Sequence, residues 1–453
     1  MSKEFIDLGL TRRIAQFIVT TDMNSIPRDA YENCKVVFLD WLGCAMIGVD
    51  NPLVIKLMRY AEMMGGNEQA SILGHGVKKN VTQAAIINGA ASHVTDYDDT
   101  TTIDIRHASV GLFPSVLALS EWKGKSGAEF LAAYIIGYKV AALIGSCVGM
   151  SQYNAGLHTT STMGHFASAA GCARLLGLNE QQTTYALSLA GTLSSGLKVV
   201  FGTMTKALHA GNAAQAGLRA ALLAEDNYTC AEDLLEGTDG YLQVFGGHID
   251  QPALDSLGKT WDFDRLAQKY HASCHFTHSA IESVLYLVNK EQLLPDDVKS
   301  ITVHSTQLAL NAAGKTDPKT ALEGKFSIHY CLANAIIRGD TGLKGFTDEK
   351  VNDPGIREFM KKISLKLGED LQPMEARVTL KTKGGKIYEK SSDVFREIPG
   401  LEEKRRRIKN KFMDICQPVW GEQKAEFVMD KVMSLEREED MKDFVDQIAA
   451  LPD

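Results

Sequence analysis

The stretch SIPRDAYENCKVVFLDWLGCAM, residues 25–46, decides the fold class of the first half of the chain. Its apolar side chains recur at the spacing of one helix face: Ala30, Cys34, Val37, Phe38, Trp41, Leu42 and Met46. Ser25 and Pro27 stand where a helix would begin. The stretch therefore predicts a buried core helix.

Capping boxes predict further helices, because their polar side chains accept from the unpaired amides of a first helical turn. Three pairs show or resemble this pattern: Ser126 with Glu129, Asn179 with Gln182, and Thr229 with Glu232. Strand patterns are nearly absent before residue 260. The first half is thus expected to be all-helical.

The pattern changes after residue 260. Residues 298–305 alternate as a short strand, and residues 376–391 read as two strands around a Lys-Gly-Gly-Lys turn. Helical spacing returns from Leu401. We expect a mainly α fold with an α+β second domain, in which 1–262 and 393–453 form the helical domain and 263–392 form an inserted α/β domain.

Composition narrows the class of partner. The net charge of -8 argues against nucleic-acid binding, which depends on Lys and Arg. The basic run 404–411 is interpreted as a solvated helix face. Eight scattered cysteines without a C-x-x-C pair indicate reduced thiols, and no secretory leader or membrane-spanning stretch is recognised. A cytoplasmic protein that binds neither nucleic acid nor membrane is expected.

Familiar cofactor and nucleophile motifs fail on spacing. Gly314-Lys-Thr316 lacks the preceding glycine of a phosphate loop, since position 309 is alanine. Neither G-x-G-x-x-G nor G-x-S-x-G occurs in a suitable context. Dinucleotide chemistry and serine hydrolysis lose support.

The segment His93-Val-Thr-Asp-Tyr-Asp-Asp-Thr100 places three carboxylates within four residues, and Arg106-His107 follows it. Carboxylates so close together must be solvated, paired with cations or used to hold a proton. A carboxylate beside an imidazole is a common acid/base arrangement near neutral pH. A polar helix end is the plain alternative.

Two further segments could bind an anion. Gly156-Leu-His158 leads into a run of hydroxyl side chains, and Phe201-Gly-Thr-Met-Thr-Lys206 ends in a lysine followed by small residues. A lysine offers a point charge for a carboxylate or phosphate. A surface lysine and a structural histidine are the alternatives that these segments leave open.

The segment 269–278 could be a metal site. His271, His275 and His278 would share a face if this stretch were helical, with Cys274 near its edge. A zinc hydrolase is therefore a competing hypothesis, although the spacing differs from the usual zinc patterns.

In this order the segments resemble the MmgE/PrpD family, together with Phe38-Leu-Asp-Trp-Leu-Gly43, Asn88-Gly-Ala-Ala-Ser-His93 and Gly324-Lys-Phe-Ser-Ile-His-Tyr330. The resemblance covers nearly the whole chain. It implies a homodimer with a large helical domain and a smaller α/β lid. It also implies 2-methylcitrate dehydratase, cis-aconitate decarboxylase or iminodisuccinate epimerase-like activity on a small polycarboxylate, without metal or organic cofactor.

Carried over position by position, the resemblance implies Asp96, His107, His158 and Lys206 as catalytic residues. It also implies that Thr100, Tyr330 and a residue of the stretch 269–278 line the cleft, and it leaves open which of His271, Cys274, His275 or His278 faces the substrate. The residues expected to bind substrate are Thr100, Arg106, Lys269, His275, His278 and Tyr330. The chain departs from the family pattern in two places. The loop between Thr100 and His107 is about one residue longer than in decarboxylase-like members, and Ala108 follows where a proline is common. His271 also stands at a position where proline is usual.

The hypothesis is that Lys206 and Arg106 bind substrate carboxylates, while His107 and His158, tuned by Asp96, exchange protons. A dehydratase or related lyase is ranked first, followed by decarboxylase and epimerase. A carboxylate-binding protein without catalysis is the alternative from another class.

Overall fold

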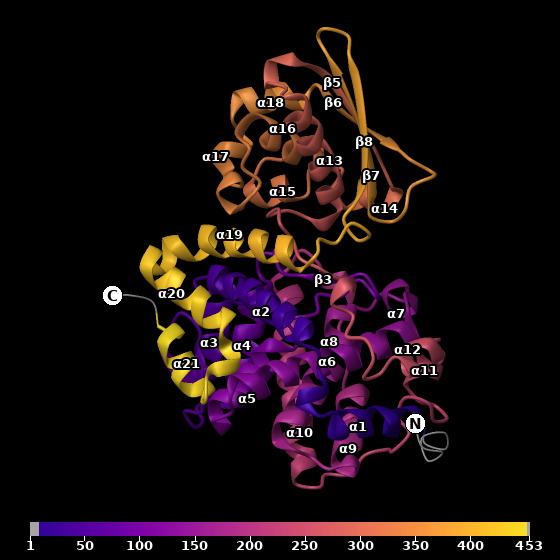
Figure 1. The fold of residues 1–453 in the computed structure, drawn as a ribbon, viewed down its shortest axis with the longest axis vertical. Helices are drawn as coiled ribbons and strands as arrows, with labels where there is room; N and C mark the ends of the chain where they lie inside the picture. The colour runs from indigo at the N-terminus through magenta and orange to yellow at the C-terminus, as the bar shows by residue number, and fades with distance from the viewer. Residues whose placement is uncertain (1–8, 451–453) are drawn as a thin grey trace. The chain divides into compact units, whose positions relative to one another are not determined.

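The computed structural model describes residues 9–450 of the chain. It contains two compact units, and each is described by itself (Figure 1). Unit 1 comprises the chain up to Gln268 and again from Leu401, and unit 2 comprises Lys269–Gly400. The protein is mainly α, with an α+β second unit, as the sequence predicts.

Unit 1 is built from helices, and its strands are short. Its helices are α1 (Leu10–Thr20), α2 (Arg28–Gly48), α3 (Pro52–Met64), α4 (Val81–His93), α5 (Phe113–Lys123), α6 (Gly127–Val148), α7 (Ser151–Asn154), α8 (Thr159–Leu176), α9 (Glu180–Thr192), α10 (Met204–Glu225), α11 (Tyr241–Val244), α12 (Gln251–Asp255), α19 (Leu401–Trp420), α20 (Glu422–Met433) and α21 (Met441–Ile448). Two antiparallel pairs join β1 (Ala70–Ile72) to β2 (Val77–Lys79) and β3 (Thr100–Thr101) to β4 (Leu266–Ala267).

The core of unit 1 is formed by helices that are buried almost all round. α6 begins at the predicted capping box of Ser126 and Glu129 and packs against α8. By length and composition α6 could cross a bilayer, as could the bent pair α2 and α3 together among the described residues. However, 94% of the most apolar stretch of α6 is buried inside the chain. Burial of this kind is typical of a core helix.

Helices α4 and α10 cross at close range because glycines face one another. A Cβ at Gly89 would lie 2.7 Å from the Cα of Gly211, and a Cβ at Gly211 would lie 2.1 Å from the carbonyl oxygen of Ile86. Only glycine permits such an approach of two backbones. The crossing sets the end of α4 beside the beginning of α10, which carry candidate site residues.

The C-terminal segment returns to unit 1 through α19, which packs along α2. Lys411 on α19 is buried, with Nζ 2.6 Å from Oδ1 of Asp40 and 2.7 Å from the carbonyl oxygen of Tyr97. Lys404 is also buried and donates to the carbonyl of Phe263. The interpretation of the basic run as a wholly solvated face is therefore wrong at both ends, because these two lysines tie α19 to the core.

Unit 2 is a four-stranded mixed sheet with helices. The strand order is β6 (Ile363–Leu367), β5 (Val298–Ser305), β7 (Glu375–Thr382) and β8 (Ile387–Asp393), and the one parallel pair is β5 with β6. The helices are α13 (His275–Glu291), α14 (Gln307–Ala313), α15 (Ala321–Lys325), α16 (Ile328–Arg338), α17 (Asp348–Val351) and α18 (Pro354–Met360). α13 packs on β7 and β8 on one side and on α16 on the other.

The predicted strand at 298–305 and the hairpin at 376–391 are confirmed as β5 and as β7 with β8. The unit boundaries fall slightly after the expected positions. Pairing with β3 keeps β4 in unit 1, and contacts of Val394 and Phe395 with α13 keep the segment after β8 in unit 2. The capping box predicted at Thr229 and Glu232 is wrong, since no helix begins there.

Candidate active site

The segment that leaves α4 forms a tight, anchored loop. Asp96 has φ 55° and Ile105 has φ 54°. A β-branched residue is rare in this left-handed region, and strain of this kind concentrates at functional sites. Lys411 holds the loop at the carbonyl of Tyr97, and Asp99 accepts from the amides of Ala108 and Ser109. The backbone around Asp96 and His107 is thus fixed from both sides.

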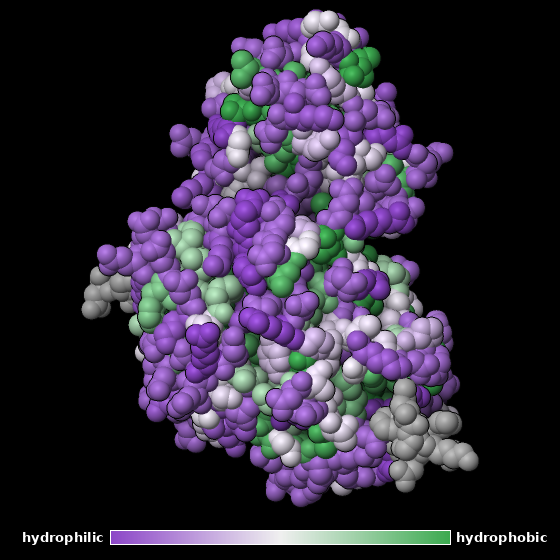
Figure 2. Space-filling view, in the orientation of Figure 1, coloured by the Kyte–Doolittle hydropathy of each residue, from purple (hydrophilic) through white to green (hydrophobic). Residues whose placement is uncertain are grey.

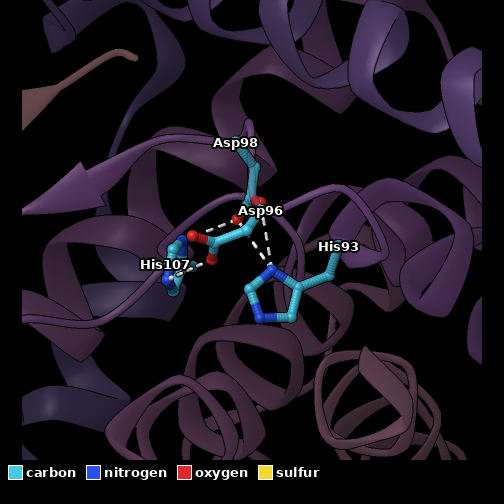
Figure 3. Close-up of side chains that lie close together, drawn as sticks. All are labelled: His93, Asp96, Asp98 and His107. Atoms are coloured by element: carbon cyan, nitrogen blue, oxygen red, sulfur yellow. Dashed lines mark hydrogen bonds and ion pairs between the residues drawn. The ribbon is translucent and has the colours of Figure 1, made fainter. Parts of the chain in front are cut away.

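A buried carboxylate, Asp98, lies between two imidazoles (Figure 3). Nδ1 of His93 is 3.0 Å from both oxygens of Asp98, and Nδ1 of His107 is 2.8 Å from Oδ2. The edge of the His107 ring packs on His93 at 4.5 Å between ring centroids. His93, Asp98 and His107 therefore form one compact group.

A second carboxylate, Asp96, lies on the other side of His107. Its Oδ1 is 3.6 Å from Nε2 of His107 and 2.6 Å from Nζ of Lys206, which lies in the first turn of α10. Asp96, Lys206 and His107 are each partly exposed, by 24%, 23% and 13% of their side chains. These three side chains are the part of the cluster that a small anionic molecule can reach.

His158 completes the cluster from the N-terminal end of α8. Its Nδ1 lies 3.1 Å from Nδ1 of His209 on α10, and its ring packs edge-on against Phe201 at 4.8 Å. The ring centroids of His158 and His93 are 6.0 Å apart. The backbone of His158 is fixed by a bond from its amide to the carbonyl of Gly196.

Burial and neighbouring charge separate the protonation states of these groups. Burial, only partly opposed by Asp98, lowers the pKa of His93 to about 4. Burial alone would raise the pKa of Asp98, but His107 and His93 outweigh it and hold that pKa well below its usual range. Burial, followed by the charges of its neighbours, keeps the pKa of His158 well below its ordinary value. At neutral pH the cluster holds an ionised Asp98 and two uncharged imidazoles, His93 and His158.

Four of the predicted residues, Asp96, His107, His158 and Lys206, are thus brought together in unit 1. Thr100 lies in β3 next to this loop and is buried. Arg106 is also buried, but it donates to Asp104 and to the carbonyl of Ala141. Asp104 already neutralises Arg106, so this placement argues against the predicted role of Arg106 as a carboxylate ligand.

The other four predicted residues belong to unit 2. Lys269 is buried at the start of this unit, and His275 and His278 lie in the first turn of α13 with ring centroids 4.6 Å apart. Nε2 of His278 lies 3.2 Å from the carbonyl of Ser273. Burial, and then the charges of His275, His271 and Lys269, hold the pKa of His278 well below its ordinary value.

Tyr330 is fully buried in α16, where its hydroxyl donates to the carbonyl of Gly345 and its ring packs on Phe346. Within unit 2 this is the environment of a core tyrosine. Its role as a substrate ligand stays a prediction.

Two of the three histidines proposed as zinc ligands, His271 and His278, have hydrogen-bond partners. His271 bonds to Thr341 through Nδ1 and to Glu282 through Nε2, at 2.7 and 3.2 Å. Among the described residues, the group whose potential ligand atoms lie within 4.8 Å of one another is instead His93, Asp96, Asp98 and His107. These atoms already pair among themselves, and Lys206 supplies the cation beside Asp96. We interpret the group as a hydrogen-bonded charge network.

His93, Asp98 and His209 were not among the residues predicted for the site. The sequence does contain a signal for the first two, since His93 closes α4 and Asp98 is the middle carboxylate of the acidic run. Which of three adjacent carboxylates meets the imidazoles depends on the left-handed turn at Asp96, and sequence spacing does not show this turn.

The chain thus combines a large helical unit, an inserted α+β unit and a cluster of acid/base groups beside a lysine. The MmgE/PrpD N-terminal domain model matches residues 12–252, and the MmgE/PrpD C-terminal domain model matches residues 271–435. The chain therefore belongs to the MmgE/PrpD family.

Relatives of known activity match along most of the chain. Cis-aconitate decarboxylase from Aspergillus terreus is 25% identical over 463 residues, covering 95% of this chain and 94% of the relative. The Mus musculus and Homo sapiens cis-aconitate decarboxylases are 26% and 25% identical and cover 85% of this chain, with 82% and 83% of their own lengths. These relatives support an enzyme of the lyase type.

Proposed function

We propose that this protein is a lyase that transfers a proton at a carbon next to a carboxylate of a small di- or tricarboxylic acid. The observation that carries the proposal is the cluster in which Lys206 and His107 lie beside Asp96, and in which His93 packs on His107 and lies 6.0 Å from the ring of His158. Acid/base groups next to a cation are what such a reaction needs.

Lys206 has the role of binding a substrate carboxylate. Without substrate, the Lys206 ammonium is paired with Asp96. A bound substrate carboxylate would also pair with this ammonium and so weaken its ion pair with Asp96. The same cation stabilises the enediolate that forms when electrons move from the reacting carbon onto the carboxylate. Lys206 therefore contributes to binding and to the transition state.

His107 and His158 have the roles of exchanging protons. The 3.6 Å from Nε2 of His107 to Asp96 exceeds a hydrogen-bond length, so this nitrogen is available to a substrate proton. Burial keeps His158 uncharged near neutral pH, and a substrate carboxylate bound beside it would favour its protonation. No metal or organic cofactor is part of the proposal.

Decarboxylation of an unsaturated tricarboxylic acid such as cis-aconitate is the favoured reaction. The sequence alone ranked dehydration first. The relatives named as decarboxylases span nearly the whole chain, and this moves decarboxylation ahead. In this reaction the C–C bond to one carboxylate breaks, CO₂ leaves, and a proton from the enzyme adds to the carbon skeleton.

Proton NMR in D₂O tests the proposal. The purified protein is incubated separately with cis-aconitate, 2-methylcitrate, citrate and iminodisuccinate. Conversion with loss of CO₂ or of water supports a lyase and says which kind. Deuterium uptake without net conversion points to an epimerase or isomerase. If binding is measured by calorimetry but none of the four acids changes, the chain is a carboxylate-binding protein and the proposal fails.

We also propose that the protein is a homodimer, as the family resemblance implies. Exposed apolar side chains gather in the segment between α9 and α10, whereas most of the face in Figure 2 is hydrophilic. The segment includes Leu193, Leu197, Val199, Phe201 and Met204. Apolar side chains that gather on a surface mark an interface. Sedimentation of Val199→Asp, with Val77→Asp as an exposed control, tests this: only the former should dissociate the dimer.

A cytoplasmic location is proposed on the same footing. All eight cysteines are free thiols, and seven of them are buried. Free thiols persist in a reducing compartment. Cell fractionation that finds the protein outside the cytoplasm would contradict this expectation.

A further inference from the structure

The contacts of Asp98 with His93 and His107 have no part in the roles proposed for Lys206, His107 and His158. Both imidazoles bring the same ring atom, Nδ1, to one carboxylate: Nδ1 of His93 is hydrogen-bonded to Asp98 at 3.0 Å, and Nδ1 of His107 forms an ion-pair contact 2.8 Å from Oδ2 that lacks hydrogen-bond geometry. Asp98 is buried, so water does not compete for its oxygens. Two histidines from different segments thus share one acceptor (Figure 3).

The chemistry of a carboxylate decides where the protons lie. An ionised carboxylate accepts hydrogen bonds and donates none, so each facing Nδ1 must be the donor. A neutral imidazole carries one N–H, and therefore Nε2 of the same ring keeps its lone pair. We propose that Asp98 is a positioning residue that holds His93 and His107 in the Nδ1–H tautomer and so makes Nε2 of His107 the proton acceptor.

The surroundings of His107 agree with this direction of transfer. Its Nε2 faces Asp96 and, beyond it, the ammonium of Lys206, while its ring packs on His93, whose centroid lies 6.0 Å from that of His158. The backbone amide of His107 donates to the hydroxyl of Thr160, and this hydrogen bond fixes the backbone that carries the ring. A proton taken up at Nε2 would lie between the carboxylates of Asp96 and Asp98, and both would stabilise the imidazolium.

His93 has a different task in this arrangement. It is fully buried, and among the described residues its Nε2 has no hydrogen-bond partner. Its ring therefore contributes one hydrogen bond, to Asp98, which orients the carboxylate toward His107. An asparagine can place an amide N–H where Nδ1 of a histidine lies, so His93→Asn should keep this function. His93→Leu retains bulk and loses the donor.

The test reads the tautomers directly, by long-range ¹H–¹⁵N NMR of histidine-labelled full-length protein at pH 8 without substrate. His93→Asn and His107→Asn assign the two signals. Wild type should show both rings as Nδ1–H. Asp98→Asn should move His107 toward Nε2–H, which free histidine favours in water, and His93→Asn should leave His107 unchanged.

Kinetics provide the second readout, and this arm rests on the proposed function. Asp98→Asn should lower kcat by about 10²-fold or more with KM nearly unchanged, because Nε2 of the wrong tautomer cannot take up a proton from solvent and pass it to the carbon that loses CO₂. His93→Asn should stay within about tenfold of wild type, and His93→Leu should fall below it.

The NMR arm needs no substrate, so a failed activity screen would leave it interpretable. An Nε2–H tautomer of His107 in wild type would overturn the inference even if Asp98→Asn did not fold. An unchanged tautomer in a folded Asp98→Asn variant would overturn it as well.

Discussion

Nζ of Lys206 lies 2.6 Å from Oδ1 of Asp96, across 110 positions of sequence. The pair exists because α4 and α10 cross at Gly89 and Gly211, which aligns the end of one helix with the start of the other. The packing of two glycines is thus the structural cause of a charged pair at the candidate active site.

Lys206→Met removes the cation of this pair and should abolish most turnover. We expect a loss of about 10²-fold or more in kcat/KM, since one preorganised electrostatic group typically contributes this much. Steady-state assays with the acid found to react would measure it. Lys56→Met, at an exposed position of α3, is the matched control and should behave as wild type. Equal kinetics of both variants would remove Lys206 from the site.

Gly211→Ala should destabilise the protein, although alanine ordinarily favours a helix over glycine. The new Cβ would meet the carbonyl of Ile86 at 2.1 Å, so α4 and α10 must separate. Overpacking of this kind costs about 1–3 kcal/mol. Urea denaturation gives the free energy of unfolding. A stability gain instead would show that the two helices do not cross so closely.

Asp99→Asn should change how stability depends on pH. Burial raises the pKa of Asp99 from 3.8 to about 7, against the hydrogen bond from Ser109. Between pH 3.8 and about pH 7 the carboxyl of Asp99 holds a proton in the folded state and has released it in the unfolded chain. The free energy of unfolding therefore falls as pH rises through this range.

The asparagine variant lacks this ionisation. Its free energy of unfolding should decline less between pH 5 and 7, by up to roughly 1.4 kcal/mol per pH unit. Urea titrations of both proteins at pH 5, 6 and 7 provide the comparison. If the free energies of unfolding of the two proteins declined equally between pH 5 and 7, Asp99 would be ionised in the folded state over this whole range.

Lys411→Met should cost about 3–5 kcal/mol, because it leaves the buried charge of Asp40 without its partner. The double variant Lys411→Met with Asp40→Leu should lose less than the two single variants together. A double-mutant cycle by chemical denaturation measures the coupling. Additive losses would show that the pair contributes nothing beyond packing.

Chelation tests the metal-free proposal. Treatment with EDTA should leave turnover unchanged, and metal analysis of the purified protein should find well under one equivalent of zinc. The charge network of His93, Asp96, Asp98 and His107 does not require a metal, because its members bond to one another and to Lys206. Near-stoichiometric zinc that chelation removes together with activity would contradict this expectation.

Periodicity predicted much of the fold. The apolar spacing in 25–46 marks α2, although residues 34–46 of this helix are buried on every side. The alternation in 298–305 marks β5, which buries one face. The capping signal at Thr229 failed, since the same residue types also occur in turns. Local patterns therefore predicted α2 and β5 correctly, and they also predicted a helix after Thr229 that does not form.

The candidate site could be predicted only in part. Four residues of the recognised motifs do lie together in the structure: Asp96, His107, His158 and Lys206. Arg106 looked equally suitable, but Gly145 leaves room for its guanidinium beside Asp104, and a Cβ there would lie 2.7 Å from Nη1. Whether a charge faces a substrate or a buried partner depends on the opposing helix, which local sequence does not specify.

We propose that His107 transfers a proton to or from a small polycarboxylic acid whose carboxylate is bound by Lys206. The most direct measurement is NMR of cis-aconitate in D₂O with wild type, His107→Asn and Lys206→Met. Wild type should release CO₂ and yield a product carrying one solvent deuterium, whereas both variants should lose this conversion while remaining folded. Conversion that persists at the wild-type rate in the two variants would contradict it.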